Sequence, residues 1–583
     1  MVRKLLASVR EFKRRSIMTP VYVIIVAMIE ILIPTVMALL IDNGITKGDM
    51  AQVVRIGGLL VALAALALFF GIRGGTDAAI ASSGFARNLR KDMFYNVQTF
   101  SFSNIDKFST SSIITRLTTD VTNVQMAYQM VLRLAVRAPF MIIFAMIFSF
   151  RIDRRLSMIF LAVIPVLGVG LWLIMSRVHP IFVRVFRLYD RLNRTVEEDL
   201  LGIRVVKSYN RQSYEQERFE GISQSIYEDF SKAGKRLAFN MPLMQACLYA
   251  SMLLLSWFGA KSIIASGNDP AVGLSTGELA SLITYAMQIL MSLMMLSMVF
   301  VMITISRASV ERIVEILDEK SDLVSPVNAI THVADGSIEF DHVTFSYSRN
   351  ADKPVLDDVS IRIESGQVVG ILGGTGSSKS SLVQLIPRLY DVVSGSIKVG
   401  GVDVRNYDLD ALRNQVAMVL QKNVLFSGTI KENLRWGDEN ATDDEMKRAC
   451  GIAQADEFIS QFPDGYDTYI EQGGANVSGG QRQRLCIARA LLKKPKVLIF
   501  DDSTSAVDTA TDSRIREGLR THIPGTTKII IAQRVASVQN ADQIIVMDDG
   551  KISAIGTHGE LLRTSDIYRE VFESQTKGGA LHA

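Results

Sequence analysis

The chain has 583 residues, of which 48% are hydrophobic and 21% are charged. Its mean hydropathy of +0.23 is too high for an ordinary soluble enzyme of this length, so we expect a membrane portion. The net charge of +4 gives no indication of nucleic-acid binding. Three widely separated cysteines, Cys247, Cys450 and Cys486, support neither a disulfide framework nor a zinc site.

The first half of the chain contains apolar stretches of roughly 20 residues, the length needed to cross a bilayer core. Basic residues outnumber acidic ones before the first stretch, which places the N-terminus in the cytoplasm. The basic segment 151–157 lies in a loop assigned to the outside and disagrees with this charge rule. We predict six transmembrane helices near residues 17–41, 56–80, 134–152, 156–176, 239–265 and 276–305.

Glu30 lies inside the first predicted span. An unpaired charge there costs at least ~3 kcal/mol on insertion scales, so we expect the side chain to face protein or water. Two interpretations stay open. Glu30 either attracts cationic substrates or takes up a proton, or it forms a structural ion pair with Arg133 or Arg137, which lie one turn apart on the third span.

Two long polar segments follow the second and fourth spans, at 81–133 and 177–238. They have helical spacing of apolar residues and few glycines or prolines, which predicts continuation of the membrane helices into the cytoplasm.

Methionines recur along the sixth predicted span at intervals that keep one helix face lined by thioethers. Such a flexible apolar face suits the binding of varied apolar compounds, and packing against neighbouring helices or lipid is the alternative. The substrate candidates on this face are Met287, Met291, Met294 and Met298.

From about residue 320 the pattern changes to short β-branched runs that alternate with helical stretches. This alternation is typical of an α/β domain with a mainly parallel core sheet. We therefore predict an α-helical six-span transmembrane domain over 1–320 and an α/β domain over 321–583.

A strand, a glycine-rich turn and a helix follow one another in "VVGILGGTGSSKSSLVQLI" (368–386), which is the context of a phosphate-binding loop. Lys379 is expected to reach the outer phosphates, and the Ser380 hydroxyl to bind Mg²⁺. The predicted ATP contacts in this segment are Gly373, Gly374, Thr375, Gly376, Ser377, Ser378, Lys379, Ser380 and Ser381.

Ser378 stands where the GxxxxGK pattern has a glycine. If this position needs a positive φ, serine costs on the order of 1 kcal/mol, and otherwise almost nothing.

Two further segments point to the same pocket. The strand in "KVLIFDD" delivers Asp501 as a carboxylate for Mg²⁺. The segment "VSGGQRQR" opens a helix whose N-terminus suits an anion, although such a turn alone is more often only a helix start. Its predicted contact residues are Val477, Ser478, Gly479, Gly480 and Gln481.

The phosphate loop, "VSGGQ" and "LIFDD", in this order and spacing, resemble the nucleotide-binding domain of an ATP-binding cassette (ABC) transporter. The six-span half resembles the membrane domain of an ABC exporter, and the likeness is greatest to one half of a bacterial heterodimeric multidrug exporter. Two segments, 110–121 and 197–212, fall where exporters place the cytoplasmic elbows that touch the cassette.

This resemblance implies roles for further residues. Tyr347 would stack on adenine, and Gln421 would contact Mg²⁺ and sense the membrane domain. The "VSGGQ" signature would cap an ATP held by the other subunit. Asp508 would lie at that same interface and couple the two sites.

Two positions depart from the family pattern. A glutamate normally follows the magnesium aspartate and a histidine follows the next strand, whereas this chain has Asp502 and Gln533. A carboxylate shortened by one methylene draws back, and an error near 1 Å can lower a rate about 100-fold. An amide carries no positive charge to stabilise the developing phosphoryl charge. These catalytic positions are therefore predicted to be degenerate, although Asp and Glu could also be interchangeable here.

The sequence thus predicts a multi-pass subunit in a bacterial cell membrane with its nucleotide-binding domain in the cytoplasm. We expect it to bind ATP and Mg²⁺, to hydrolyse ATP weakly on its own, and to export amphipathic compounds. The expected partners are membrane lipid and a second ABC half-transporter with the usual glutamate and histidine, without nucleic acid. Alternatives are a lipid or peptide exporter, or a membrane-anchored nucleotide-sensing regulatory subunit.

Overall fold

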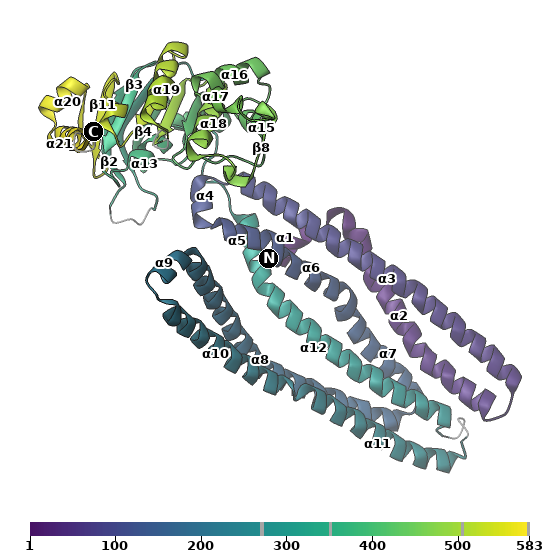
Figure 1. Ribbon diagram of the computed structural model, residues 1–583. Helices are drawn as coiled ribbons and strands as arrows, with labels where there is room; N and C mark the ends of the chain where they lie inside the picture. The colour runs from purple at the N-terminus through teal and green to yellow at the C-terminus, as the bar shows by residue number, and fades with distance from the viewer. Residues whose placement is uncertain (269–272, 349–352, 503–506, 580–583) are drawn as a thin grey trace. The chain divides into compact units, whose positions relative to one another are not determined.

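The computed structural model describes residues 1–268, 273–348, 353–502 and 507–579 (Figure 1). The chain divides into two compact units. The N-terminal unit comprises Met1–Gln98 and Thr110–Glu319, and the C-terminal unit comprises Thr99–Ser109 and Lys320–Ala583.

Within the described residues, six helices of the N-terminal unit are long and apolar enough to cross a membrane. Each contains one of the predicted spans, so the six-span helical domain is confirmed. They are Arg10–Ile45, Met50–Gln98, Thr110–Ile152, Arg154–Leu201, Gln212–Ser266 and Thr276–Asp318.

Several of these helices continue far beyond their apolar spans, as the spacing of apolar residues in 81–133 and 177–238 predicts. Short π-helical turns (η2, η3 and η4) interrupt some of them. The elements of this unit are α1 (Val2–Ala7), η1 (Arg10–Phe12), α2 (Lys13–Leu39), η2 (Leu40–Ile45), α3 (Met50–Gln98), α5 (Thr110–Thr115), η3 (Arg116–Asp120), α6 (Val121–Met130), η4 (Val131–Ala135), α7 (Val136–Ile152), α8 (Arg154–Leu201), α9 (Ile203–Ser208), α10 (Gln212–Leu237), α11 (Asn240–Ser266) and α12 (Thr276–Asp318).

Helix α2 packs along α3, and α8 runs beside α10 and α11 (Figure 1). Several polar groups inside this bundle are paired. The buried Asp120 accepts from the Arg312 Nε atom at 2.7 Å, and the buried Tyr285 hydroxyl donates to the Ile31 carbonyl at 2.9 Å. Because a buried polar group without a partner is costly, these contacts fix how α12 lies against its neighbours.

The basic segment 151–157 forms a tight turn between α7 and α8. Asp153 caps α8, and its carboxylate accepts from the backbone N–H groups of Arg155 and Leu156 at 2.7 and 3.1 Å.

The described part of the C-terminal unit contains a six-stranded sheet in the order β12-β11-β3-β10-β9-β6 and a four-stranded antiparallel sheet in the order β2-β1-β4-β5. The pairs β11–β3, β3–β10, β10–β9 and β9–β6 are parallel, which confirms the mainly parallel core sheet. The strands are β1 (Ile338–Phe345), β2 (Leu356–Ile363), β3 (Val368–Gly373), β4 (Ser394–Val399), β5 (Val402–Asp403), β6 (Val416–Val419), β7 (Gly428–Thr429), β8 (Tyr469–Ile470), β9 (Val497–Asp501), β10 (Thr527–Ile531), β11 (Gln543–Asp548) and β12 (Lys551–Gly556).

Strands β9 and β10 are buried along their whole length, as expected for a parallel sheet covered on both faces. The helices that accompany the sheets include two capped helices of 14 residues each, α18 and α19. The helices of this unit are α4 (Phe102–Lys107), α13 (Lys379–Gln384), α14 (Leu409–Gln415), α15 (Ile430–Leu434), α16 (Asp443–Ile452), α17 (Asp456–Ile459), α18 (Gly479–Leu492), α19 (Thr509–His522), α20 (His558–Thr564) and α21 (Asp566–Gly579).

The short helix α4 groups with the C-terminal unit although it lies between two membrane helices in the sequence. Ser101 caps it, and Asp106 accepts a hydrogen bond from the Tyr390 hydroxyl at 2.8 Å. The elbow expected at 110–121 is therefore preceded by residues 99–109, which belong to the C-terminal unit by their contacts.

Candidate functional site

The carboxyl ends of three neighbouring strands bring the predicted catalytic residues to one edge of the core sheet. In the strand register, Ile531 of β10 lies between Ile371 of β3 and Asp501 of β9. The phosphate loop follows β3, Gln533 follows β10, and Asp502 follows β9. Ligands of open α/β sheets bind at this edge, outside the carboxyl ends of the strands.

The phosphate loop depends on glycine at two positions. A Cβ atom on Gly373 would lie 2.3 Å from the Met547 carbonyl oxygen, and Gly376 has a φ of +86°. Gly374, Thr375 and Gly376 form the exposed tip of the loop, whereas the Ser377 hydroxyl is buried and donates to the Gly374 carbonyl at 2.9 Å.

Ser378 has a φ of +68° and a ψ of +21°, in the left-handed region. This position therefore has the positive φ at which serine is unfavourable, and serine costs on the order of 1 kcal/mol here relative to glycine.

Lys379 lies over its own loop. Its ammonium donates to the carbonyls of Gly373 and Gly374 at 2.9 and 2.7 Å and to the Ser377 hydroxyl at 3.2 Å. Burial lowers the pKa of Lys379, and the nearby carboxylates of Asp502 and Asp501 oppose that change. This cation is held where a phosphate at the loop could accept from it.

Ser380 and Asp501 come together at the base of the pocket, where the Ser380 hydroxyl donates to Asp501 Oδ1 at 2.8 Å. Burial raises the pKa of Asp501, and the hydrogen bond from Ser380 works against that rise. A hydroxyl and a carboxylate oxygen at this spacing fit a Mg²⁺ ion, which takes few protein oxygens and completes its shell with phosphate and water. Gln421 lies beyond the carboxyl end of β6, the strand beside β9, and is exposed.

Tyr347 lies beside the helix that begins at the phosphate loop. Its hydroxyl is 3.0 Å from the Ser381 hydroxyl and donates to Gln384 at 3.2 Å. The ring packs edge-on against Tyr390, with centroids 5.0 Å apart, and half of the residue is exposed. An exposed aromatic face next to a phosphate loop can stack on a nucleotide base.

The two residues that depart from the family pattern contact each other. The side-chain amide of Gln533 donates to Asp502 Oδ2 at 2.7 Å. Asp502 has a φ of +47°, so its backbone also occupies the left-handed region. The carboxylate that would accept a proton from an attacking water is therefore hydrogen-bonded to a neutral amide.

A third residue, which the sequence analysis did not identify, holds the loop that carries Gln533. The Gln575 amide on α21 donates to the Gln533 carbonyl at 2.8 Å, and its oxygen accepts from the Val535 N–H at 2.9 Å. No motif marks Gln575, and only the packing of the C-terminal helix reveals it.

The signature residues open α18. Ser478 accepts from the Gln481 N–H at 3.2 Å, and Gln481 accepts from the Ser478 N–H at 2.9 Å, so the pair forms a capping box. Val477 is buried, Ser478 and Gly479 are exposed, and Gly480 is half-buried. In the described ranges, no hydrogen bond or ion pair joins the signature to the phosphate loop of the same chain.

Asp508 caps α19 and is exposed. The backbone N–H of Thr511 lowers the pKa of its carboxyl group and donates to it at 2.9 Å.

In the N-terminal unit, the structure pairs Glu30 with Arg137, whose Nη2 atom donates to both carboxylate oxygens at 2.8 and 2.6 Å. The sequence alone left open whether Arg133 or Arg137 pairs with Glu30, and the structure selects Arg137. On α12, three of the methionine candidates are exposed and Met294 is half-buried; the exposed ones are Met287, Met291 and Met298.

Comparison with known proteins identifies both halves of the chain. Residues 16–294 match the ABC transporter transmembrane region, and residues 356–505 match the ABC transporter family. The uncharacterized ABC transporter ATP-binding protein YfiB of Bacillus subtilis is 38% identical over 547 residues, which cover 94% of each chain.

A second relative, the uncharacterized ABC transporter ATP-binding protein Rv1273c of Mycobacterium tuberculosis, is 35% identical over 573 residues and 97% of each chain. The structure of a bacterial Atm1-family ABC exporter with ATP bound has the same fold, with a TM-score of 0.81 at 24% identity over 96% of this chain and 98% of that one. This chain therefore belongs to the ABC transporter family, as a multi-pass half-transporter of the exporter type in which the membrane domain is fused to its ATP-binding domain.

Proposed function

We propose that this chain is one half of a heterodimeric ABC exporter. It binds ATP with Mg²⁺ in its own pocket and hydrolyses it poorly, while its signature completes the pocket of a partner half that carries the usual glutamate and histidine. The complex moves amphipathic, drug-like compounds out of a bacterial cell, with the ATP-binding domain in the cytoplasm.

The hydrogen bond between Gln533 and Asp502 is the main observation behind this proposal, because it engages the carboxylate that ATP cleavage would need. Attack by water on the γ-phosphate is assisted by a carboxylate that orients the water and accepts its proton. Asp502 is one methylene shorter than glutamate, and one of its oxygens already accepts from Gln533 at 2.7 Å. The amide also offers no charge to the developing phosphoryl anion.

The groups that hold the nucleotide support ATP binding in the same pocket. Lys379 supplies an ammonium at the loop, and Ser380 and Asp501 would hold Mg²⁺, which neutralises charge on the outer phosphates. Tyr347 offers an aromatic face for adenine. Binding and cleavage thus rest on different side chains.

Nucleotide trapping in the purified native complex tests the proposal. With a photoreactive azido-ATP, Mg²⁺ and vanadate, trapped product is expected on the partner's phosphate loop and not on the loop of Lys379. Equal trapping at the two loops contradicts it. This chain purified alone is expected to show little ATPase activity, and robust turnover that Asp502→Asn abolishes is a second contradicting result.

The transport function has its own test, because the same residues suit a nucleotide-sensing subunit that moves nothing. Inside-out vesicles that contain both halves are expected to accumulate an amphipathic dye only when ATP is present. The exposed methionines of α12 support the apolar character of the substrate. An absence of ATP-dependent accumulation favours the sensor.

A further inference from the structure

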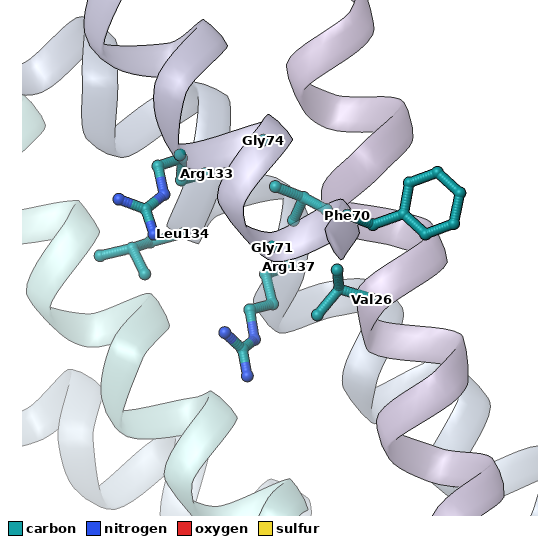
Figure 2. Close-up of a pocket in the computed structure, with 9 residues that line it drawn as sticks. Val26, Phe70, Gly71, Gly74, Arg133, Leu134 and Arg137 are labelled. Carbon is teal, nitrogen blue, oxygen red and sulfur yellow. The ribbon is translucent and has the colours of Figure 1, made fainter. Parts of the chain in front are cut away.

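A small cavity in the N-terminal unit is lined by two arginines. It lies between α2, α3 and the helix formed by η4 and α7, and its volume is about 50 Å³. None of its nine lining residues, all in the described part of the chain, is acidic. Figure 2 shows Arg133 and Arg137 extending to the same side of their helix, while the ring of Phe70 points away from them.

The charges around this cavity do not cancel. Arg137 is paired with Glu30 at 2.6 Å, one turn of α2 beyond the lining residue Val26. Arg133 is exposed, and its guanidinium makes no ion pair or hydrogen bond with any residue in the described ranges. Two arginines and one glutamate leave a net charge of +1, carried by Arg133.

The position of Arg133 makes this excess charge significant. Val26 and Gly71 belong to the apolar stretches 17–41 and 56–80, and Arg133 directly precedes the third predicted span, 134–152, so the cavity lies towards the cytoplasmic end of the membrane spans. An arginine at the end of a span turns its charge towards water or an anionic group. Arg133 lies in η4, a π-helical turn that ends at Ala135, one helical turn before Pro139, whose missing N–H leaves the Ala135 carbonyl without its usual donor.

Glycines on α3 leave the space open. A Cβ atom placed on Gly71 or Gly75 would meet no atom within 4 Å, whereas one on Gly74 would touch Tyr22 at 3.3 Å. Gly74 therefore permits close packing with α2, while Gly71 and Gly75 border free space. A cavity of about 50 Å³ holds a group of a few heavy atoms and is far too small for a whole drug-sized molecule.

We propose that this cavity binds the acidic group of an amphipathic organic anion, a carboxylate or sulfonate, through Arg133, and that the apolar body of the ligand lies outside it. The inference rests on the proposed export function, for which it names the substrate class. The proposed ligand is an anion, whereas one interpretation of Glu30 from the sequence is a site for cationic substrates. The Glu30 carboxylate is already neutralised by Arg137.

Binding of a matched pair of probes tests this proposal. The native complex in phosphatidylcholine nanodiscs, without nucleotide, is titrated with dansyl-labelled undecanoic acid and with its methyl ester, and dansyl emission reports binding. The acid is expected to bind roughly tenfold more tightly, the effect of one charge-assisted hydrogen bond. Equal affinities overturn the proposal, including the case in which an acid of the partner half already pairs with Arg133.

Variants locate the effect. Arg133→Gln is expected to remove the preference for the acid and to leave the ester unchanged, whereas Arg133→Lys keeps part of it. Gly71→Leu fills the free space and leaves all charges unchanged, and it is expected to weaken binding of the acid. The matched control is Arg73→Gln, because Arg73 lies on α3 over the Phe69 ring and does not line the cavity. Loss of the preference in Arg73→Gln, or its persistence in Arg133→Gln, overturns the assignment.

A lipid headgroup offers the same chemistry as an organic acid. Nanodiscs with increasing phosphatidylglycerol separate the two sources, and unchanged probe affinity supports the proposal. Competition by this lipid in the native protein that disappears in Arg133→Gln assigns the site to lipid and overturns the substrate class. Since no nucleotide is used, these results are independent of which pocket hydrolyses ATP.

Discussion

The two sides of the ATP pocket differ in what their polar side chains contact. On the binding side, Lys379 donates to backbone carbonyls of its loop, and Ser380 donates to the buried Asp501. On the cleavage side, Asp502 and Gln533 contact each other. We propose from this difference that binding of a triphosphate depends on residues at the ends of β3 and β9, whereas its cleavage depends on the length and charge of two further side chains.

Removal of the loop cation is the strongest way to break this comparison. Lys379→Ala is expected to weaken ATP binding to this pocket roughly 1,000-fold, because it loses more than one charge-assisted hydrogen bond to phosphate. Equilibrium binding of labelled ATP to the native complex measures it. The control is Lys422→Ala, an exposed lysine beyond β6, and a similar loss there would show that the effect is not local.

Restoration of the cleavage side sharpens the comparison. The double substitution Asp502→Glu with Gln533→His is expected to raise product formation in this pocket roughly 100-fold. Glutamate restores the length of the carboxylate side chain, and histidine restores a side chain that can carry positive charge. Vanadate trapping on this chain measures it, and ATP affinity should not change. Asp512→Glu serves as the control, since that acid pairs with Arg516 on α19. An unaltered rate in the double variant would separate cleavage from these two positions.

The C-terminal helix offers a test of positioning. In the double variant, Gln575→Ala is expected to lower trapping about tenfold, because the loop of residue 533 loses both contacts that hold it and a small displacement is costly. ATP affinity should stay constant, which a general loss of structure would not allow. Ser574→Ala, beside it on α21, is the control.

The aromatic contact has a smaller expected effect. Tyr347→Ala is expected to weaken ATP binding about tenfold through lost stacking. Tyr347→Phe loses only the hydroxyl contacts to Ser381 and Gln384 and should bind almost normally. Equal losses in both variants would assign the effect to the hydroxyl.

The smallest expected effect concerns the strained loop residue. Ser378→Gly is expected to tighten ATP binding by at most about fivefold, because glycine adopts the positive φ without the cost of roughly 1 kcal/mol. Isothermal titration with the same complex measures it. Weaker binding in this variant would show that the Ser378 side chain contributes to the pocket.

Motifs predict the local structure around the phosphate loop well, because its elements are contiguous in the sequence. The strand, turn and helix around Lys379 are contiguous, and the strand before Asp501 is plainly apolar. The sequence predicts the six spans for the same reason, since each is one continuous apolar run.

Contacts that depend on register or helix rotation could not be predicted. The hydrogen bond between Asp502 and Gln533 follows from the pairing of β9 with β10. The choice of Arg137 over Arg133 as the partner of Glu30 depends on the direction in which each side chain leaves its helix. Gln575 gives no signal, because an ordinary glutamine on a surface helix has no distinguishing pattern.

The π-helical turn η4 holds about one residue more per turn than the α-helix around it. If this turn closed into regular α-helix, side chains on one side of it would rotate by about 100° around the helix axis relative to those on the other side, since an α-helix has 3.6 residues per turn. Arg133 lies inside this turn and Arg137 beyond it. The Arg133 guanidinium could therefore rotate around the helix axis while Arg137 stays paired with Glu30. Such a rotation would release the proposed anion without any tilting of the helix.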